Sequence, residues 1–254
     1  MELQDRVSLV TGSATGVGRA TAVQLAKRGS HVVVNYTRSE EEARETVAMV
    51  EALGRRTLLC RADVSDDAQV RDMVAKTLAA FGRLDVLVNN AGATSFIQHS
   101  DLEAVTDEVW DRILAVNLKG AFYCMRAASK PMIEQGRGAI VNVSSVAGLR
   151  GGGSSIPYAA SKGALNTITM SMARVLAPAV RVNTVCPGFI EGRWRAGGLG
   201  ANYETARKRT SEAAPLKGVA TPESIASVIV AIIADMDWVT GEIIAVDGGS
   251  SVRL

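Results

Sequence analysis

The sequence has little of what marks proteins that bind nucleic acids or membranes. Aromatic residues make up only 4% of its 254 residues, and 28 basic side chains nearly balance 26 acidic ones. Nucleic-acid-binding proteins rely on basic patches and aromatic stacking surfaces. A net charge of +2 also gives little attraction to an anionic membrane. We therefore expect no nucleic acid and no membrane among its partners.

Cysteine and histidine are also scarce. The three cysteines, Cys60, Cys124 and Cys186, are far apart and form no C-x-x-C pair. They are predicted to be small buried side chains in a reducing compartment, without disulfides or a zinc site. His31 and His99 have no partners in the sequence that suggest a catalytic triad. Because no H-x-x-x-H pair or group of carboxylates occurs, we expect no metal.

Long hydrophobic runs are missing as well. No apolar stretch approaches the ~20 residues that a helix needs to cross a bilayer. The opening MELQDRVSLVTG enters a short apolar run directly, which is not the pattern of a signal peptide. These features predict a cytoplasmic protein.

What the sequence does contain is a regular alternation of short β-branched runs with segments of helical periodicity. Apolar residues recur at i, i+3, i+4 and i+7 in segments 19–28, 39–53 and 67–81. This alternation predicts βαβ units and a parallel sheet. We predict a single domain over residues 1–254, an α/β Rossmann-type doubly wound parallel sheet with helices on both faces. The predicted strands are 7–11, 31–35, 57–61, 84–89, 139–144, 180–186 and 243–246.

Segment 189–217 breaks the alternation, because it is rich in glycine, mixed in charge and weakly periodic. It follows the carboxyl end of a predicted strand, where α/β sheets bind ligands. We predict a mobile substrate lid in which Trp194 closes over an apolar substrate. The alternative is a solvated loop with an incidental tryptophan.

A glycine-rich turn, TGSATGVG, lies between the first predicted strand and the first helix. Its glycines, Gly12, Gly16 and Gly18, permit a tight turn and a close approach of the backbone to phosphate. The helix N-terminus then offers free N–H groups to a pyrophosphate. The spacing G-x-x-x-G-x-G differs from the G-x-G-x-x-G of long-chain dehydrogenases, but its position predicts a dinucleotide site.

Tyr158 and Lys162 are four residues apart in YAASK, so on a helix they lie on one face. A free phenol titrates near pH ~10, and a neighbouring cation lowers that value towards the range useful for proton transfer. Taken alone, the pair also fits a half-buried tyrosine beside a solvated lysine.

Taken together, these motifs resemble those of the short-chain dehydrogenase/reductase family. The resemblance extends over nearly the whole chain and is strongest to the 3-oxoacyl-acyl-carrier-protein reductase group. The matching motifs, in order, are TGSATGVG at 11–18, Asp63-Val64, NNAG at 89–92, Asn117, Ser145 with YAASK at 158–162, Pro187-Gly188 and VDGG at 246–249.

The resemblance implies four catalytic residues. Tyr158 is expected to be the general acid in reduction, and Lys162 to lower its pKa and bind the nicotinamide ribose. Ser145 is expected to hold the substrate carbonyl oxygen, and Asn117 to anchor a water of a proton relay. Asn89 and Ser144 are interpreted as structural hydrogen-bonding residues.

The resemblance and the glycine-rich turn together imply a cofactor site of many residues. Asp63 and Val64 are expected at the adenine, and Asn90, Ala91 and Gly92 at its ribose. Ile190 is expected to contact the nicotinamide through its backbone, because Gly192 stands where the family often has threonine. The predicted cofactor-binding residues are Gly12, Ser13, Thr15, Gly16, Val17, Gly18, Tyr36, Thr37, Arg38, Asp63, Val64, Asn90, Ala91, Gly92, Tyr158, Lys162, Pro187, Gly188 and Ile190.

The end of the second predicted strand bears on the choice of dinucleotide. NAD-specific relatives place an acid there, whereas this chain has Tyr36, followed by Thr37 and Arg38. An arginine suits a 2′-phosphate, so we predict NADP(H) over NAD(H). Thr15 stands where many NADP-dependent relatives carry a basic residue, which argues the other way.

The sequence therefore predicts an oxidoreductase that interconverts a ketone and a secondary alcohol. A 3-oxoacyl thioester is the leading substrate by resemblance, and a sugar, polyol or other small alcohol is the alternative. A non-catalytic NADP-sensing regulator is the alternative from another class, although Ser145, Tyr158 and Lys162 are all present. By resemblance, and because 102–129 and 159–176 are strongly apolar, we also predict a homotetramer.

Overall fold

All seven predicted strands occur, and they form one parallel sheet with the order β3-β2-β1-β4-β5-β6-β7. The computed structural model describes residues 1–252, so the last two residues of the predicted domain lie outside it. The strands are β1 (Val7–Val10), β2 (His31–Tyr36), β3 (Thr57–Arg61), β4 (Val86–Asn89), β5 (Gly138–Val143), β6 (Val180–Pro187) and β7 (Ile243–Val246).

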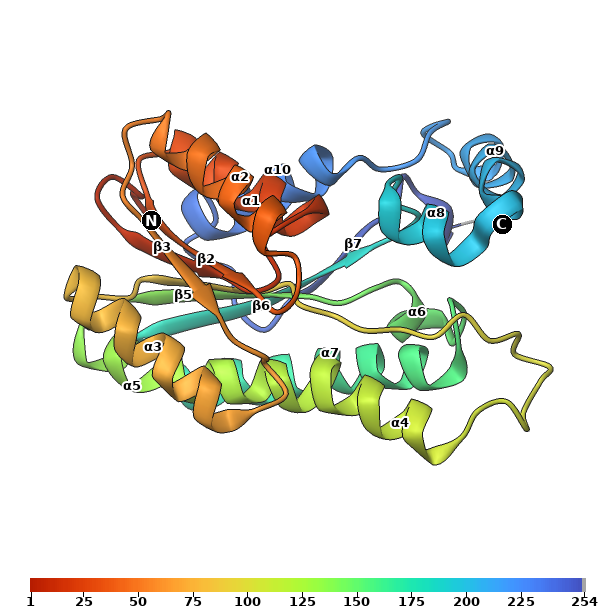
Figure 1. Ribbon diagram of the computed structural model, residues 1–254, viewed down its shortest axis with the longest axis horizontal. Helices are drawn as coiled ribbons and strands as arrows, with labels where there is room; N and C mark the ends of the chain where they lie inside the picture. The colour runs from red at the N-terminus through yellow and green to blue at the C-terminus, as the bar shows by residue number, and fades with distance from the viewer. Residues whose placement is uncertain (253–254) are drawn as a thin grey trace.

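Helices cover both faces of the sheet, as predicted for a Rossmann-type domain (Figure 1). One layer contains α1 (Gly16–Lys27), α2 (Glu40–Glu51) and α10 (Pro222–Ala234). The other contains α3 (Asp67–Phe81), α4 (Asp107–Leu114), α5 (Ala121–Glu134) and α7 (Ile156–Leu176). The remaining helical elements are α6 (Ala147–Arg150), α8 (Arg193–Leu199), α9 (Tyr203–Ala213), the π-helix η1 (Ala115–Gly120) and the 3-10 turns η2 (Gly200–Asn202) and η3 (Ser250–Val252).

The strands are apolar on both sides because each layer of helices needs an apolar surface to pack on. Successive side chains of a strand point to opposite faces of the sheet. In β2, Val32 and Val34 therefore join one core cluster with Leu25 of α1 and Ile229 of α10. Val33, between them, joins the other cluster with helix α3 and helix α5. This double burial explains why the strand sequences read as continuous apolar runs.

The sheet order places a topological switch point between β1 and β4. From β1 the chain proceeds outwards to β2 and β3, and then returns to the other side of β1 to form β4. Connections on the two sides diverge at the carboxyl ends of these strands, and ligands of open α/β sheets bind in the resulting crevice. The candidate site is therefore expected at this edge.

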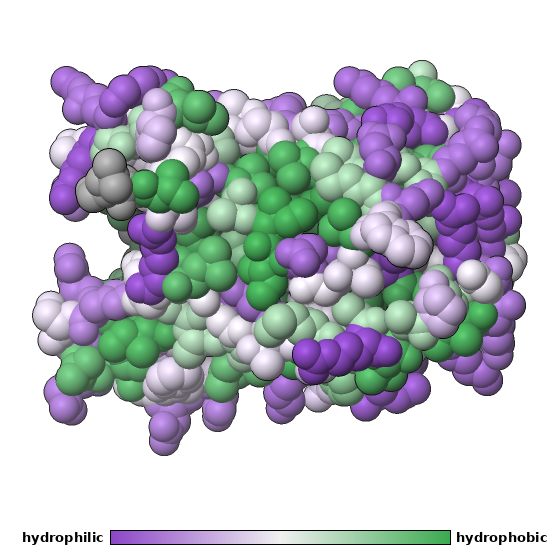
Figure 2. Space-filling model, turned by 180° about the vertical axis from the view of Figure 1, so that it is seen from behind, coloured by the Kyte–Doolittle hydropathy of each residue, from purple (hydrophilic) through white to green (hydrophobic). Residues whose placement is uncertain are grey.

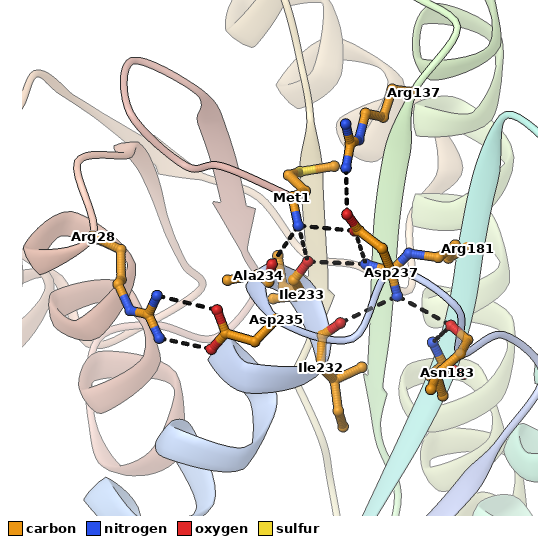
Figure 3. A network of polar contacts seen from close by, with 11 residues as sticks. Met1, Arg28, Arg137, Arg181, Asn183, Ile232, Ile233, Ala234, Asp235 and Asp237 are labelled. Carbon is orange, nitrogen blue, oxygen red and sulfur yellow. Dashed lines mark hydrogen bonds and ion pairs between the residues drawn. The ribbon is translucent and has the colours of Figure 1, made fainter.

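The helix α10 is held to the sheet at its C-terminus by a network of polar contacts (Figure 3). The guanidinium of Arg181 on β6 donates to the carbonyls of Ile232, Ile233 and Val239 at 3.1, 2.9 and 3.1 Å. The last carbonyls of a helix have no partner within the helix, so a cation satisfies them well. The Met1 α-ammonium donates to the carbonyl of Ala234 in the same network.

The structure differs from the sequence prediction mainly in segment 189–217. This segment contains helices α8 and α9, whereas the sequence indicated an irregular region. No residue of α9 is buried, so this helix does not need a face of apolar residues. Its sequence therefore lacks the apolar residues at helical spacing from which a helix is predicted. Elsewhere the differences are shifts of element ends by one to three residues.

Within residues 1–252, no helix is both long enough and apolar enough to span a membrane.

Candidate active site

The first turn of α7 fixes the position of Tyr158. Ser155 caps this helix, and its hydroxyl accepts a hydrogen bond from the Tyr158 backbone N–H at 3.4 Å. Pro157 occupies the first turn, where its missing N–H costs nothing. Pro157 is one of the prolines at which the sequence predicts that a helix could begin or end, and here a helix begins. Because the helix begins here, Tyr158 lies at the carboxyl edge of the sheet.

Tyr158 and Lys162 lie on one face of α7, as predicted, and both are buried, with 8% and 4% of their surface exposed. The Lys162 Nζ is 5.7 Å from the centre of the Tyr158 ring. It donates a hydrogen bond of 2.8 Å to the carbonyl of Val143, at the end of β5. Burial lowers the pKa of Lys162 from its ordinary 10.5 to about 8. The alternative of a solvated lysine is therefore wrong.

Asn117 lies inside the π-helix η1, a widened turn of a kind often found at functional sites. Its Oδ1 accepts from the Ala93 N–H at 2.7 Å, and its Nδ2 donates to the Ala93 carbonyl at 2.9 Å and to the Ser161 hydroxyl at 3.0 Å. A Cβ on Gly92 would lie 3.5 Å from Asn117 Oδ1 and 3.9 Å from Lys162 Nζ. The backbone of the NNAG motif therefore lies against both Asn117 and Lys162.

Ser145 follows β5 and is buried, with 7% of its surface exposed. Its hydroxyl accepts from the N–H of Ala147 at 3.1 Å, and Ala147 packs with Tyr158 in a small apolar cluster. The preceding Ser144 donates instead to the carbonyl of Lys162 at 3.0 Å, which confirms its predicted structural role. The two serines thus have separate partners, and only Ser145 is linked to the neighbourhood of the Tyr158 ring.

A row of buried polar side chains joins three strands to α7 beneath this site. Asn89 on β4 donates to Asn142 Oδ1 on β5 at 2.8 Å, which confirms the structural reading of Asn89. Asn142 donates to Thr169 Oγ1 on α7 at 2.9 Å, and Thr169 is 2.7 Å from Thr184 Oγ1 on β6. Buried polar groups must find partners. This polar row therefore fixes how α7 sits on the sheet.

The glycine-rich turn fits a dinucleotide pyrophosphate. Gly12 and Gly16 have φ values of +60° and +56°, which glycine adopts without strain. A Cβ on Gly18 would lie 2.4 Å from the Gly12 carbonyl oxygen, so the helix packs tightly on the turn. No atom lies within 4 Å of a Cβ built on Gly16, and Thr15 leaves the start of α1 without a side-chain cap. Open space in front of free helix N–H groups suits a phosphate.

The turn is supported from both sides. The Gly12 N–H donates to Asn35 Oδ1 at 3.0 Å, and the Ser13 N–H donates to the Asn35 carbonyl at 2.9 Å. Asn90 Nδ2 donates to the carbonyls of Thr11 and Gly12 at 2.9 and 3.0 Å. Asn90 was predicted at the adenine ribose, and here its side-chain amide supports the phosphate turn. Val17 packs against the core, and a Cβ on Gly12 would lie 3.0 Å from Ala91 Cα.

The predicted adenine-side residues lie at the carboxyl ends of β2 and β3. Asp63 Oδ1 accepts from the N–H and the hydroxyl of Ser65 at 2.9 and 2.7 Å. Val64 is buried and touches the backbone of Gly120, where a Cβ would come within 2.9 Å of its side chain. Both residues thus line the turn that leads from β3 into α3.

The residues predicted to select the dinucleotide have distinct environments. Tyr36 is buried, and its pKa is raised by that burial and by a hydrogen bond to Glu40. The Thr37 hydroxyl donates to the Ala62 carbonyl at 3.3 Å, so it is already engaged. Arg38 is exposed. Of the three side chains, Arg38 is therefore the one that carries a positive charge to the surface.

The end of β6 supplies Pro187 and Gly188. A Cβ on Gly188 would lie 2.8 Å from the Cβ of Asp247, so only glycine fits between the ends of β6 and β7. Ile190 forms a parallel bridge with Ala220, which ties the start of segment 189–217 to the chain entering α10. Four residues further on, Trp194 on α8 has its ring centre 6.1 Å from that of Tyr158.

Cys186, one of three free thiols, lies close to Lys162 and Ser144. All three cysteines are buried, as predicted, and burial raises the pKa of each, that of Cys124 to about 12. Thiols of this kind are poor nucleophiles. The described residues contain no group of three His, Cys, Asp or Glu side chains that could hold a metal ion.

Comparison with known proteins points to one family. A family model described as enoyl-(acyl carrier protein) reductase matches residues 12–251. A protein named as ketoacyl reductase 2 of the granaticin polyketide synthase, from Streptomyces violaceoruber, is 41% identical over 96% of this chain and 95% of its own. L-rhamnose 1-dehydrogenase (NAD(P)(+)) from a Sphingomonas strain is 38% identical over 99% of this chain and 98% of its own. A solved structure from Burkholderia xenovorans, named as a short-chain dehydrogenase/reductase, has a TM-score of 0.91 and 37% identity over 98% of this chain and 99% of its own.

The buried ammonium of Lys162 generates a prediction about stability. Below pH 8 the lysine is charged in the folded and unfolded states, so folding carries the full cost of burying it. Between pH 8 and 10.5 the folded lysine is neutral while the unfolded one still binds a proton, so stability rises with pH. We expect Lys162→Met to increase the free energy of unfolding at pH 7. The shift in pKa corresponds to roughly 3 kcal/mol, and the lost hydrogen bond to Val143 offsets ~1 kcal/mol of that gain.

Urea unfolding at pH 7 and pH 9.5 measures this effect, with the exposed Lys130→Met as the control. The advantage of Lys162→Met should be smaller at pH 9.5 than at pH 7. A variant less stable than the wild type at pH 7 would show that the ammonium is not buried at a net cost.

Proposed function

The chain belongs to the short-chain dehydrogenase/reductase family, and from this premise we propose that it is an NADPH-dependent reductase of ketones to secondary alcohols. The observation that carries the proposal is the convergence of Tyr158, Lys162, Ser145 and Asn117 at one sheet edge, with a buried ammonium 5.7 Å from the phenol ring. An activity screen of ketones and alcohols with both nicotinamide cofactors, followed by absorbance, tests it.

In the proposed reaction the cofactor supplies the hydride that is added to the carbonyl carbon. The chain's own residues do the rest. Ser145 holds the carbonyl oxygen by a hydrogen bond, and Tyr158 transfers its phenolic proton to that oxygen. Lys162 stabilises the phenolate that is left behind, because a cation next to a phenol favours its ionised form. Asn117 supports a water through which the proton is replaced. In the opposite direction Tyr158 accepts the proton.

The turn at 11–18 would hold the pyrophosphate, and the carboxyl ends of β2 and β3 would hold the adenosine half. Three observations support a preference for NADPH. Tyr36 replaces the acid that would repel a 2′-phosphate, Arg38 is exposed beside it, and the nearest acid, Glu40, is paired with Tyr36 and Arg44. A carboxylate so engaged repels a phosphate less than a free one does.

A 3-oxoacyl thioester is the proposed substrate class. The support is the similarity to proteins named as ketoacyl reductases. The alternative, a sugar dehydrogenase, is supported by the similarity to L-rhamnose 1-dehydrogenase.

A non-catalytic sensor would have no need of a lysine buried at a cost next to a tyrosine. Segment 189–217 is proposed as the substrate lid, because α8 places Trp194 against Tyr158.

We further propose a cytoplasmic homotetramer. Three buried free thiols suit a reducing compartment such as the cytoplasm.

The tetramer is supported by large apolar side chains that are exposed on α5 and α7, including Phe122 at 38%, Met170 at 38% and Val175 at 74%. Figure 2 shows that apolar surface also gathers in the middle of the face opposite to that of Figure 1. Surfaces of this kind usually mark contacts with another protein.

Replacement of the proposed proton donor is the first test of mechanism. Tyr158→Phe should lower kcat at least ~10²-fold, the usual contribution of a general acid. The affinity for NADPH, measured by fluorescence titration, should change little, because the ring itself is kept. Tyr123→Phe, on α5 with its ring against Arg126, is the matched control. If Tyr158→Phe retained more than about a tenth of wild-type kcat, another residue would have to donate the proton.

The cofactor preference is tested at Arg38. Arg38→Ala should raise KM for NADPH by roughly tenfold, because one charge-assisted hydrogen bond to a phosphate is worth about 1.5–3 kcal/mol. The KM for NADH should remain nearly constant. Arg28→Ala, which removes an exposed arginine paired with Asp235 at the far end of α1, is the control. A wild-type enzyme with the higher kcat/KM for NADH would contradict the assignment.

The oligomeric state is tested by light scattering at micromolar concentration. We expect a particle of four chains, each of 26.7 kDa. Met170→Glu and Val175→Glu place charges on the exposed apolar face of α7 and should reduce the mass of the particle. A stable monomer for the wild-type protein would refute the proposal.

A further inference from the structure

Helix α8 lies between two glycines whose backbone conformations other residues rarely adopt. Gly192 has a φ of +137° and Gly200 has a φ of +52°. No atom lies within 4 Å of a Cβ built on either residue, so it is the backbone conformation and not crowding that calls for glycine. This seven-residue helix is therefore entered and left through turns that glycine adopts without strain.

Two contacts define where α8 lies in this structure. A Cβ on Gly198 would be 1.9 Å from Cε2 of Phe96, so the Phe96 ring rests directly on the helix backbone. At the other end, Arg193 Nη1 is 2.7 Å from Glu42 Oε1 on α2. Helix α8 therefore extends from the cofactor half of the proposed site, at α2, to the loop that follows β4.

Phe96 is itself tied to the start of α7. The N–H of Ile97 donates to the Ser154 carbonyl at 2.8 Å, next to the Ser155 cap of α7. Arg112 on α4 donates to the Thr94 carbonyl at 2.8 Å and so holds the loop from its other side. Because Tyr158 is in the first turn of the same helix, Phe96 and Tyr158 have fixed positions relative to each other.

Trp194 covers Tyr158 from outside. The two rings meet edge to face, with centres 6.1 Å apart and planes at 62°. Tyr158 is 8% exposed and Trp194 is 54% exposed, so Trp194 is the ring of this pair that solvent reaches more easily. A substrate whose carbonyl oxygen approaches Tyr158 therefore comes close to the Trp194 ring.

We propose that Trp194 and Phe96 act as an aromatic clamp that selects ketones with a flat apolar group on the reacting carbon. The inference rests on the proposed carbonyl reductase function and specifies its substrate. Aromatic rings bury large apolar areas and favour offset or edge contacts with other flat groups. A small aliphatic group gains less from such a surface than a flat ring does, because it buries less apolar area.

The test compares two 3-oxo esters that differ only at the reacting carbon. Ethyl benzoylacetate carries a phenyl group there, and ethyl acetoacetate carries a methyl group. We expect the wild-type enzyme with NADPH to have at least a tenfold higher kcat/KM for the phenyl ester, and little activity on L-rhamnose with NADP. Trp194→Ala should reduce the phenyl-to-methyl ratio at least tenfold, mainly through KM, and Phe96→Ala should reduce it less.

Trp194→Phe should restore most of the ratio, because it keeps a flat ring. Trp238→Ala is the matched control, since Trp238 is fully exposed outside the site and its removal should leave the ratio within twofold. If Trp194→Ala left the ratio unchanged or raised it, Trp194 would be a bystander or a steric barrier, and the clamp would be overturned.

Failure of the proposed function would look different, because neither ester would be reduced. The clamp is then tested by binding. In the Trp110→Phe/Trp238→Phe variant with NADPH, only Trp194 fluoresces among the tryptophans. Quenching of its emission by ethyl benzoylacetate, but not by ethyl acetoacetate at equal concentration, would support the clamp. Equal responses to both esters would overturn it.

Discussion

The hydrogen bond between the Lys162 ammonium and the Val143 carbonyl is the contact on which the geometry of the site depends. A buried cation is costly unless it has partners, and here the partner is a backbone atom at the end of a central strand. The bond therefore joins α7 to β5 and holds the Lys162 Nζ 5.7 Å from the centre of the Tyr158 ring. The backbone of Gly92 also lies next to the Lys162 ammonium, and because Gly92 has no side chain it leaves space beside that ammonium.

The connections that follow the strands at this edge of the sheet divide the proposed site into a cofactor half and a substrate half. The connections after β1, β2 and β3 form the cofactor half, with the open start of α1 at its centre. The connections after β4, β5 and β6 form the proposed substrate half, which carries Asn117, Ser145 and helix α8 beside Gly92 and Gly188, two residues predicted to contact the cofactor. The polar row from Asn89 to Thr184 connects strands β4, β5 and β6 beneath the substrate half. A rigid floor of this kind allows the loops above it to vary.

The sequence predicted the parts of this architecture that have a local period or a fixed spacing. The buried strands were visible because each faces two layers of helices, and Tyr158 with Lys162 because i and i+4 share a helix face. Contacts made by backbone atoms do not depend on a residue pattern. The sequence therefore could not predict the hydrogen bond from Lys162 to the Val143 carbonyl or the packing of the Phe96 ring on Gly198. Helix α9 was missed because it buries nothing, and the amide of Asn90 turned out to support the phosphate turn.

The π-helix at Ala115–Gly120 has a consequence for the length of the chain. Helices α4 and α5 run through it as one continuous rod from Asp107 to Glu134. A widened turn accommodates one residue more than an α-helical turn does. Deleting one residue there would let the rod become a regular α-helix and leave α5 in its present phase. A deletion in α4, where no widened turn absorbs it, would instead rotate every later side chain by about 100° around the helix axis. Met125 and Met132 would then leave the core. The widened turn thus gives Asn117 its place in the rod while the phase of the helix after it is kept.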